Sequence, residues 1–124
     1  DVLAMKRTLH TFEGFHDFAS FADKRMDKHV STKVAVELIK LHKLENILVI
    51  RIVGSHFLWK MVRRIVGVAV EAGRGALTAA EAKAMLGAYS EIPARCTAPP
   101  SGLFLEKVLY EGDSLPELRT PVIL

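Results

Sequence analysis

The chain has 124 residues, of which half are apolar and a quarter are charged, and its formal net charge is +3. This length is that of one ordinary domain, and the composition excludes a disordered tail. The longest apolar runs are far shorter than the ~20 residues that cross a bilayer, so we expect no membrane span. The single cysteine cannot form an internal disulfide and no secretory signal pattern opens the chain, which predicts a cytoplasmic protein.

Charge is distributed unevenly along the chain. Residues 23–75 hold eleven lysines or arginines against five acids, whereas the two ends together are mildly acidic. Such a basic block is typical of a protein that binds a polyanion, and it is also typical of an ordinary solvated face. The charge pattern by itself therefore leaves both interpretations open.

The first expected element is an amphipathic helix over residues 2–13, because apolar residues recur at near-helical spacing and Gly14 follows as a terminator. Asp17 is expected to cap a short turn, although a carboxylate beside His16 would also suit acid–base chemistry. Aromatic residues spaced three apart are expected to anchor this loop to the core. They are Phe15, Phe18 and Phe21.

A hairpin and a long helix are expected in the middle of the chain. Apolar and polar residues alternate imperfectly over 33–41, and the β-branched run at 46–54 predicts a strand. The residues between these runs are few enough for antiparallel pairing. Ser55 as N-cap and Gly73 as terminator predict a helix over 56–72. Its apolar arc is wide, so we expect two of its sides to be covered, one of them by something outside this chain.

The last third of the chain combines a helix, a loop and a strand. Thr78 with Glu81 three residues later forms a capping box, which predicts a helix that ends at Gly87. The proline-rich segment 92–102 is expected to be irregular, and alternation over 103–110 predicts a final strand. The order helix, strand, strand, helix, helix, strand indicates an α+β fold, an antiparallel sheet with helices packed on one face.

The patterns of the common catalytic sites are absent from the sequence. It has no Walker loop, no His-Glu-x-x-His and no paired cysteines, and its five histidines lack metal-ligand spacing, so no metal site is predicted. Cys96 is expected to be an inert thiol. The residues that stand out are Arg63 and Arg64. Arg63 lies near Trp59 on the predicted helix, where an arginine either extends to solvent or meets a carboxylate.

Three ordered segments carry more specific information. Residues 14–21 read GFHDFASF, residues 54–67 read GSHFLWKMVRRIVG, and residues 98–110 read APPSGLFLEKVLY. These resemble the G-x-H-D-F-x-S-F, G-x-x-F-L-x-x-M-V-R-x-I-V-G and A-P-A-x-G-L-Y-L-x-x-V-x-Y motifs of TruA-type tRNA pseudouridine synthases. The resemblance is to the C-terminal half of that family, and it departs from the pattern at Pro100 and Phe104.

The resemblance implies that residues 1–124 are the C-terminal domain of a cofactor-free tRNA pseudouridine synthase, with one half of the pseudouridine synthase fold. Such enzymes are homodimers that isomerise uridine to pseudouridine in tRNA, typically in the anticodon arm. Their catalytic aspartate lies in an R-T-D-x-G-V-H motif of the N-terminal half, which is absent from this sequence. The chain begins at Asp1 rather than Met, inside what resembles a helix, so we expect it to be a piece of a longer protein.

The resemblance also assigns residues. Arg63 stands at the position of the arginine that pairs with the catalytic aspartate, and Leu103 at that of the leucine lining the base pocket. We expect Arg63 to be partly accessible at the edge of a concave apolar surface that includes Leu103, with Arg64 facing elsewhere. A basic loop after Phe21 is expected to contact tRNA phosphates. Its cationic residues are Lys24, Arg25, Lys28 and Lys33.

Three functions are compatible with these observations. The first is the enzyme part, which we expect to be inactive by itself because the nucleophile is missing. The second is a non-catalytic RNA-binding α+β module that kept the fold and lost the chemistry. The third is a structural module that self-associates through the apolar face of the helix over 56–72.

Overall fold

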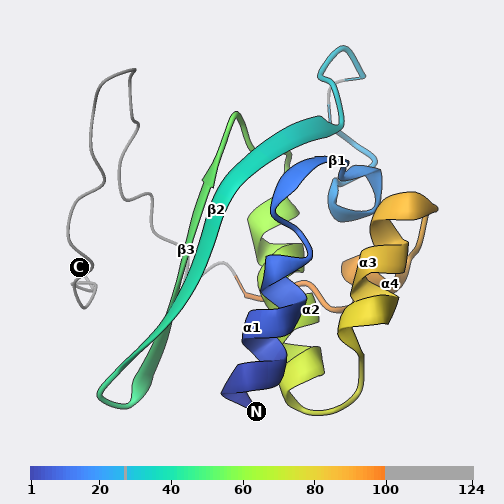
Figure 1. Cartoon of the computed structure of the whole chain (residues 1–124). Coiled ribbons are helices and arrows are strands. Elements are labelled where there is room, and N and C mark those ends of the chain that lie inside the picture. The colour runs from blue at the N-terminus through green and yellow to red at the C-terminus, as the bar shows by residue number, and fades with distance from the viewer. Residues whose placement is uncertain (27, 100–124) are drawn as a thin grey trace, which may run out of the picture.

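A computed structural model describes residues 1–26 and 28–99 and shows a three-stranded antiparallel sheet with helices on one face (Figure 1). The predicted α+β class is therefore confirmed. No helix in this part of the chain is long and apolar enough to cross a membrane. The elements in chain order are α1 Val2–His10, β1 Gly14–Asp17, the 3₁₀ helix η1 Ala19–Phe21, β2 Lys33–Leu44, β3 Ile47–Gly54, α2 Met61–Gly73, α3 Ala79–Gly87 and α4 Ile92–Arg95.

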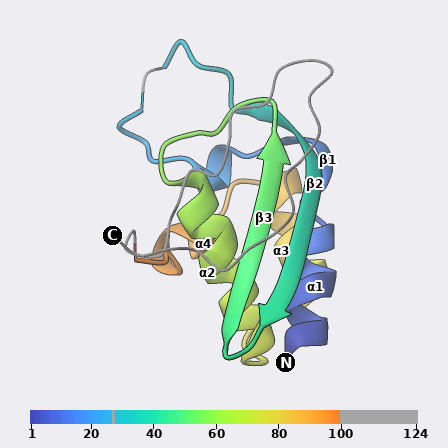
Figure 2. The ribbon, with the colours of Figure 1, turned by 90° about the vertical axis from the view of Figure 1, so that its left-hand side faces the viewer.

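The long β2–β3 hairpin forms most of the sheet, and Figure 2 shows the helices behind it. The predicted hairpin is confirmed, and its turn is tighter than expected because β2 continues to Leu44, which pairs with Ile47. The two turn residues include Glu45 with a φ of 53°, in the left-handed region. Strand β1 was not predicted. Four residues are too few for a clear alternation, and β1 forms only because the edge of β2 is available for pairing.

The core lies between the sheet and the helices, and aromatic rings fill its end near β1. Phe12, Phe18 and Phe21 are fully buried, and the ring of Phe12 lies edge-on to that of Phe21 with centroids 5.1 Å apart. The prediction that Phe15 anchors this segment is wrong, because that side chain is 68% exposed on β1. Phe12 takes its place, just beyond the end of α1. The predicted turn cap is confirmed, since the Asp17 carboxylate accepts from the backbone nitrogen of Ala19 at 3.0 Å.

Helix α2 begins five residues later than the sequence predicts. The Ser55 hydroxyl accepts a hydrogen bond from the backbone nitrogen of Ala35 on β2 at 3.1 Å, and it caps no helix. The N-cap is Lys60, with a φ of 66° and no side-chain capping bond. Residues 55–60 therefore form an irregular connection that ends in a turn, in which the backbone nitrogen of Met61 donates to the backbone oxygen of Leu58 at 3.0 Å. Ser55 is bonded to β2 and is not available as the N-cap.

The ends of the other helices also differ in detail from the predictions. Helix α1 stops at His10, and α2 ends in a Schellman motif in which the C′ residue is Gly75, with a φ of 85°, rather than Gly73. The capping box of Thr78 and Glu81 is confirmed. The prediction of an irregular segment is wrong for its first residues, because Pro93 fits the first turn of the short helix α4. The strand expected over 103–110 lies outside the described residues.

Candidate functional site

The arginine that the sequence singles out lies on the first turn of α2, against the segment that follows α4. The Arg63 Nε group donates to the backbone oxygen of Ala98 at 2.8 Å, and the backbone nitrogen of Ala98 donates to the backbone oxygen of Arg63 at 3.0 Å. The side chain of Arg63 is half-buried. These paired hydrogen bonds hold together two residues that are 35 positions apart in sequence.

A glycine on the same helix lets this segment approach so closely. A Cβ atom placed on Gly67 would lie 1.5 Å from the carbonyl oxygen of Cys96 and 3.3 Å from the backbone nitrogen of Ala98. Only glycine leaves room for another backbone to cross the helix at this point. Segment 96–98 therefore covers one flank of α2, while α1 packs against the helix elsewhere. Burial raises the pKa of the Cys96 thiol, which favours its unreactive protonated form.

The next residue lies on a different flank of α2. Arg64 is only 9% exposed, and its Nη1 donates to the backbone oxygen of Ala22 at 2.7 Å. Ala22 directly follows the first of the three sequence segments that resemble family motifs. The end of the first segment and the first residue of the third thus lie at the first turn of α2, through the contacts of Arg64 with Ala22 and of Arg63 with Ala98.

The guanidinium of Arg63 has capacity for a further partner. Within residues 1–26 and 28–99 no carboxylate pairs with it, and only its Nε makes a hydrogen bond. The two terminal nitrogens of an arginine form a planar fork that matches the two oxygens of a carboxylate. The arrangement can therefore orient an aspartate supplied from elsewhere.

Two of the predicted phosphate contacts already form ion pairs. Lys24 Nζ lies 3.0 Å from a Glu91 oxygen, and Arg25 Nη2 lies 2.9 Å from a buried Asp23 oxygen that Lys60 Nζ also approaches at 3.1 Å. Hydrogen bonds from Arg25, reinforced by Lys60, hold the pKa of the Asp23 carboxyl well below its usual range. Both Lys24 and Arg25 nevertheless remain about 70% exposed, so their charges still face solvent.

The other predicted site residues are less constrained. Lys28 and Lys33 are exposed, the first in the loop before β2 and the second as the first residue of that strand. Leu103, together with Pro100 and Phe104, lies outside the described residues. In the part of the chain that the structure describes, no three histidine, cysteine, aspartate or glutamate side chains gather as metal ligands would.

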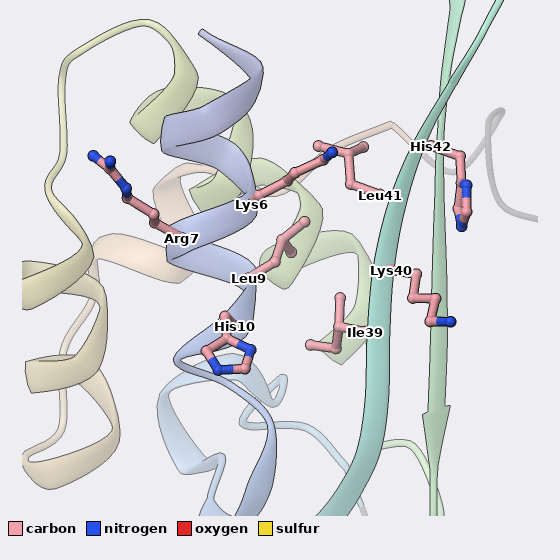
Figure 3. A pocket seen from close by; sticks show the side chains of 8 residues that line it. All are labelled: Lys6, Arg7, Leu9, His10, Ile39, Lys40, Leu41 and His42. Carbon is pink, nitrogen blue, oxygen red and sulfur yellow. The ribbon is translucent and has the colours of Figure 1, made fainter.

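A hollow of about 430 Å³ lies between α1 and β2, away from these contacts. Figure 3 shows that Leu9 and Lys6 of α1 point toward the sheet, and that Ile39 and Leu41 point back toward the helix. The side chains of Arg7, Lys40 and His42 turn away from this space, whereas Lys6 reaches across it.

The fold defines a class, an α+β domain with a three-stranded antiparallel sheet, in which helix α2 carries a half-buried arginine bonded to Ala98. The profile of a family described as tRNA pseudouridine synthase matches residues 9–111, and the chain belongs to this family. This confirms the resemblance found from the sequence motifs.

Individual relatives agree with the family match. The chain is 39% identical over 110 residues to "tRNA pseudouridine synthase A" of Thermosipho melanesiensis, an alignment that covers 89% of this chain and 45% of that protein. It is 37% identical over 117 residues to the protein of the same description from Pyrococcus abyssi, covering 94% and 43%. The Geobacillus kaustophilus protein gives 37% over 117 residues, covering 92% and 44%. The chain thus spans less than half the length of these curated relatives.

Sequence analysis did not find every residue at this site. It assigned no role to Arg64, whose burial depends on Ala22, a residue 42 positions away. It also placed Trp59 on the apolar arc of a helix, whereas the side chain is 49% exposed beside Arg25. Tyr89 follows α3 without any recognisable pattern around it. Only the positions of neighbouring elements in space could reveal these three residues.

Proposed function

We propose that this chain is the part of a tRNA pseudouridine synthase that contributes the active-site arginine, Arg63, and one wall of the base pocket, Leu103. The observation that carries the proposal is the pair of hydrogen bonds between Arg63 and Ala98. They place the arginine of one motif beside the first residue of the motif that contains Leu103. Leu103 follows Ala98 by five residues in the same motif.

The chemistry of the reaction explains why such an arginine is needed. Isomerisation breaks the bond between C1′ of the ribose and N1 of uracil and forms a new bond from C1′ to C5, with a proton leaving C5 and another added at N1. The base must first leave its stack, and an aspartate nucleophile must be ionised and correctly aimed. The fork of Arg63 would stabilise the ionised carboxylate and orient it, and the apolar wall of Leu103 would hold the base.

The aspartate must come from outside the sequence considered, because no R-T-D-x-G-V-H segment occurs in these 124 residues. We therefore include in the proposal an N-terminal half of the same enzyme as partner, tRNA as substrate, and the phosphate contacts Lys24, Arg25, Lys28 and Lys33. A cytoplasmic homodimer as the complete enzyme, and the anticodon arm as the target, belong to the same proposal and rest on the family resemblance.

The first test concerns activity. The purified chain should form no pseudouridine in any tRNA, measured by mass spectrometry of nuclease digests, because none of its side chains replaces the missing nucleophile. Addition of a segment that carries the R-T-D motif should restore activity. Pseudouridine formed by the chain alone would show that its nucleophile lies within these residues.

The second test concerns Arg63 in the complete synthase. Arg63→Lys should lower the single-turnover rate by about 100-fold or more, because lysine lacks the fork that orients the aspartate, while tRNA affinity changes less than about twofold. Arg74→Lys is the matched control, since Arg74 lies exposed at the far end of α2 and pairs only with Glu71 in the described chain. A fully active Arg63→Lys enzyme would show that the assignment of Arg63 is wrong.

The runner-up is an RNA-binding module without catalysis. It is favoured by the exposed cations near α2, which bind phosphate whether or not an aspartate is present. Activity of the chain with its N-terminal partner would exclude this alternative.

A further inference from the structure

Two aromatic side chains are unusually exposed beside the first turn of α2. Trp59, in the connection before α2, is 49% exposed, and Tyr89, after α3, is 56% exposed. Tryptophan and tyrosine rings normally bury most of their apolar surface, so exposed rings of this size often mark a binding surface. The rings lie on either side of the segment that carries Lys24 and Arg25.

Each of these rings is accompanied by cations. The Arg25 guanidinium carbon lies 4.8 Å from the centroid of the Trp59 ring, and Lys60 Nζ lies 5.6 Å from it. Lys24 Nζ lies 5.4 Å from the centroid of the Tyr89 ring. We call these five residues the cation–aromatic strip. Tyr89 has one cation beside its ring and Trp59 has two, and the strip draws on three separate parts of the chain.

The strip is held in place by two carboxylates. Asp23 receives hydrogen bonds from Arg25 through both Nε, at 3.1 Å, and Nη2, at 2.9 Å, and Glu91 accepts from Lys24 at 3.0 Å. The backbone nitrogen of Asp23 also donates to the backbone oxygen of Trp59 at 3.0 Å, which ties the two segments together. The cations are therefore oriented before any ligand arrives, which reduces the entropy that binding must offset.

Three residues of the strip, Lys24, Arg25 and Tyr89, line a hollow of about 280 Å³ with an excess of positive charge. Counting Lys60 beside it, four cationic side chains face two carboxylates in this region. A ligand that complements it must combine flat rings with negative charge. The residues that line the hollow are Asp23, Lys24, Arg25, Arg64, Tyr89, Glu91 and Ala94.

We propose that the cation–aromatic strip binds unpaired nucleotides of RNA, with bases stacked on the rings of Trp59 and Tyr89 and phosphates beside Lys24, Arg25 and Lys60. Every nucleobase has a π-face that stacks on an aromatic ring or a guanidinium plane, so this recognition tolerates any sequence. The inference rests on the proposed function because it takes RNA as the ligand. It adds that the bound nucleotides are unpaired and names the residues that contact them.

The position of the strip suits the proposed reaction. Trp59 precedes Arg63 by four residues in the sequence, on the connection to α2. Arg64, the neighbour of Arg63 on that helix, lines the hollow beside Lys24 and Arg25. A uridine that leaves its stack also leaves its neighbours without a stacking partner. Rings placed beside the reacting nucleotide would stabilise those neighbours and so favour the flipped-out state.

A protein segment is the competing occupant, since exposed aromatic rings also anchor protein interfaces. The flanking cations favour RNA. In an apolar protein interface, the three charges around the two rings would lose their water without gaining an anionic partner, which costs free energy. RNA supplies a phosphate for each of them. Failure of single-stranded RNA to engage the rings would therefore assign the strip to a protein partner.

The experiment uses the fact that Trp59 is the single tryptophan of the chain, so its fluorescence reports on the strip alone. The 124-residue chain is titrated with a single-stranded oligouridylate of about eight nucleotides, and separately with duplex RNA of equal length. We expect saturable quenching and a strong salt dependence with the single strand, and at least fivefold less quenching with the duplex. Binding of the single strand, seen by anisotropy of a labelled oligonucleotide, without any quenching of Trp59 would overturn the proposal.

Variants identify the second ring. Tyr89→Ala should weaken single-strand binding roughly tenfold, the usual effect of losing one stacked base, and leave duplex binding within twofold. Phe15→Ala is the matched control, since Phe15 is 68% exposed and has no cation over its ring among the described residues. The affinity of this variant for the single strand should equal that of the unaltered chain. Equal losses in Tyr89→Ala and Phe15→Ala, with circular dichroism unchanged in both, would contradict a specific role for the strip.

The outcome is separable from that of the proposed function. Quenching of Trp59 by single strands together with a fully active Arg63→Lys synthase would retain the strip and exclude the catalytic assignment of Arg63. Loss of activity in Arg63→Lys, with single strands that bind the chain without quenching Trp59, would retain the assignment of Arg63 and exclude the strip.

Discussion

Arg63 and Arg64 lie on two flanks of α2, and the two flanks differ in how much of the arginine side chain they bury. Arg64 is nearly buried and donates to the carbonyl of Ala22, and Arg63 is half-buried and donates to the carbonyl of Ala98. Both side chains thus end on a backbone oxygen. They differ in exposure. Other elements of the chain enclose Arg64, whereas Arg63 keeps accessible surface.

Adjacent identical residues on one helix thus differ in how far the fold encloses them, and the role proposed for Arg63 depends on that difference. A cation that the fold has enclosed stabilises the fold, because removing it leaves a buried acceptor unpaired. A cation that the fold leaves partly open is available to a partner. Measurements on the two flanks should therefore separate effects on stability from effects on activity.

The largest effect on stability is expected on the Arg63 flank, at the point where segment 96–98 crosses the helix. Gly67→Ala should lower the free energy of unfolding by about 3 kcal/mol, because the added Cβ would lie 1.5 Å from the Cys96 carbonyl oxygen and the backbone must move. An alanine in an open helix position does the opposite and stabilises by up to about 1 kcal/mol.

Gly87→Ala is the control for that substitution, since nothing lies within 4 Å of the added atom at the end of α3. Urea denaturation of both variants measures the two effects. Equal stabilities for Gly67→Ala and Gly87→Ala would show that segment 96–98 does not press against α2 in solution.

An intermediate effect is expected from the arginines themselves. Arg64→Ala should cost about 2–3 kcal/mol of stability, because it removes a buried charged donor from the Ala22 carbonyl, whereas Arg63→Ala should cost about 1 kcal/mol. Arg64→Met, which keeps the apolar stem, should recover part of the loss. The measurement is urea denaturation followed by circular dichroism. A greater loss of unfolding free energy in Arg63→Ala than in Arg64→Ala would show that Arg63, and not Arg64, is the arginine that stabilises the fold more.

The smallest effect is the dependence of stability on pH that Asp23 causes, on the flank of α2 that carries Arg64. Hydrogen bonds from Arg25 hold the pKa of Asp23 well below its ordinary value of 3.8, so the folded state gains stability from this carboxylate at every pH above about 4. That gain is lost as the pH falls below 4 toward the lowered pKa. The difference in unfolding free energy between the chain and Asp23→Asn should therefore narrow steadily below pH 4.

Glu45→Gln on the exposed β2–β3 turn serves as the control for that titration, because Glu45 forms no ion pair within the described ranges. The difference in unfolding free energy between Glu45→Gln and the unaltered chain should stay nearly constant over the same pH interval. A constant difference for Asp23→Asn as well would show that the Asp23 pairs contribute nothing to folding.

Much of the fold could be predicted where local signals were strong. The β-branched run before Gly54 and the capping box at Thr78 specify their elements through backbone preferences that depend only on near neighbours, and both predictions are confirmed. Strand β1 and helix α4 were missed because each has four residues. Elements that short form only when a neighbouring strand or helix is already in place to receive them.

For the candidate site, the sequence by itself determined the family, through three ordered motifs, and the assignment of Arg63 within it stays a prediction. Tertiary structure alone decided that Ser55 caps no helix and that Arg64 is buried and bonded to Ala22. It also decided that Trp59 lies beside Arg25 and Tyr89 beside Lys24. The physical reason is distance along the chain. Periodicity and capping report interactions within about four residues, whereas burial and ion pairing depend on segments tens of residues apart that meet only when the chain has folded.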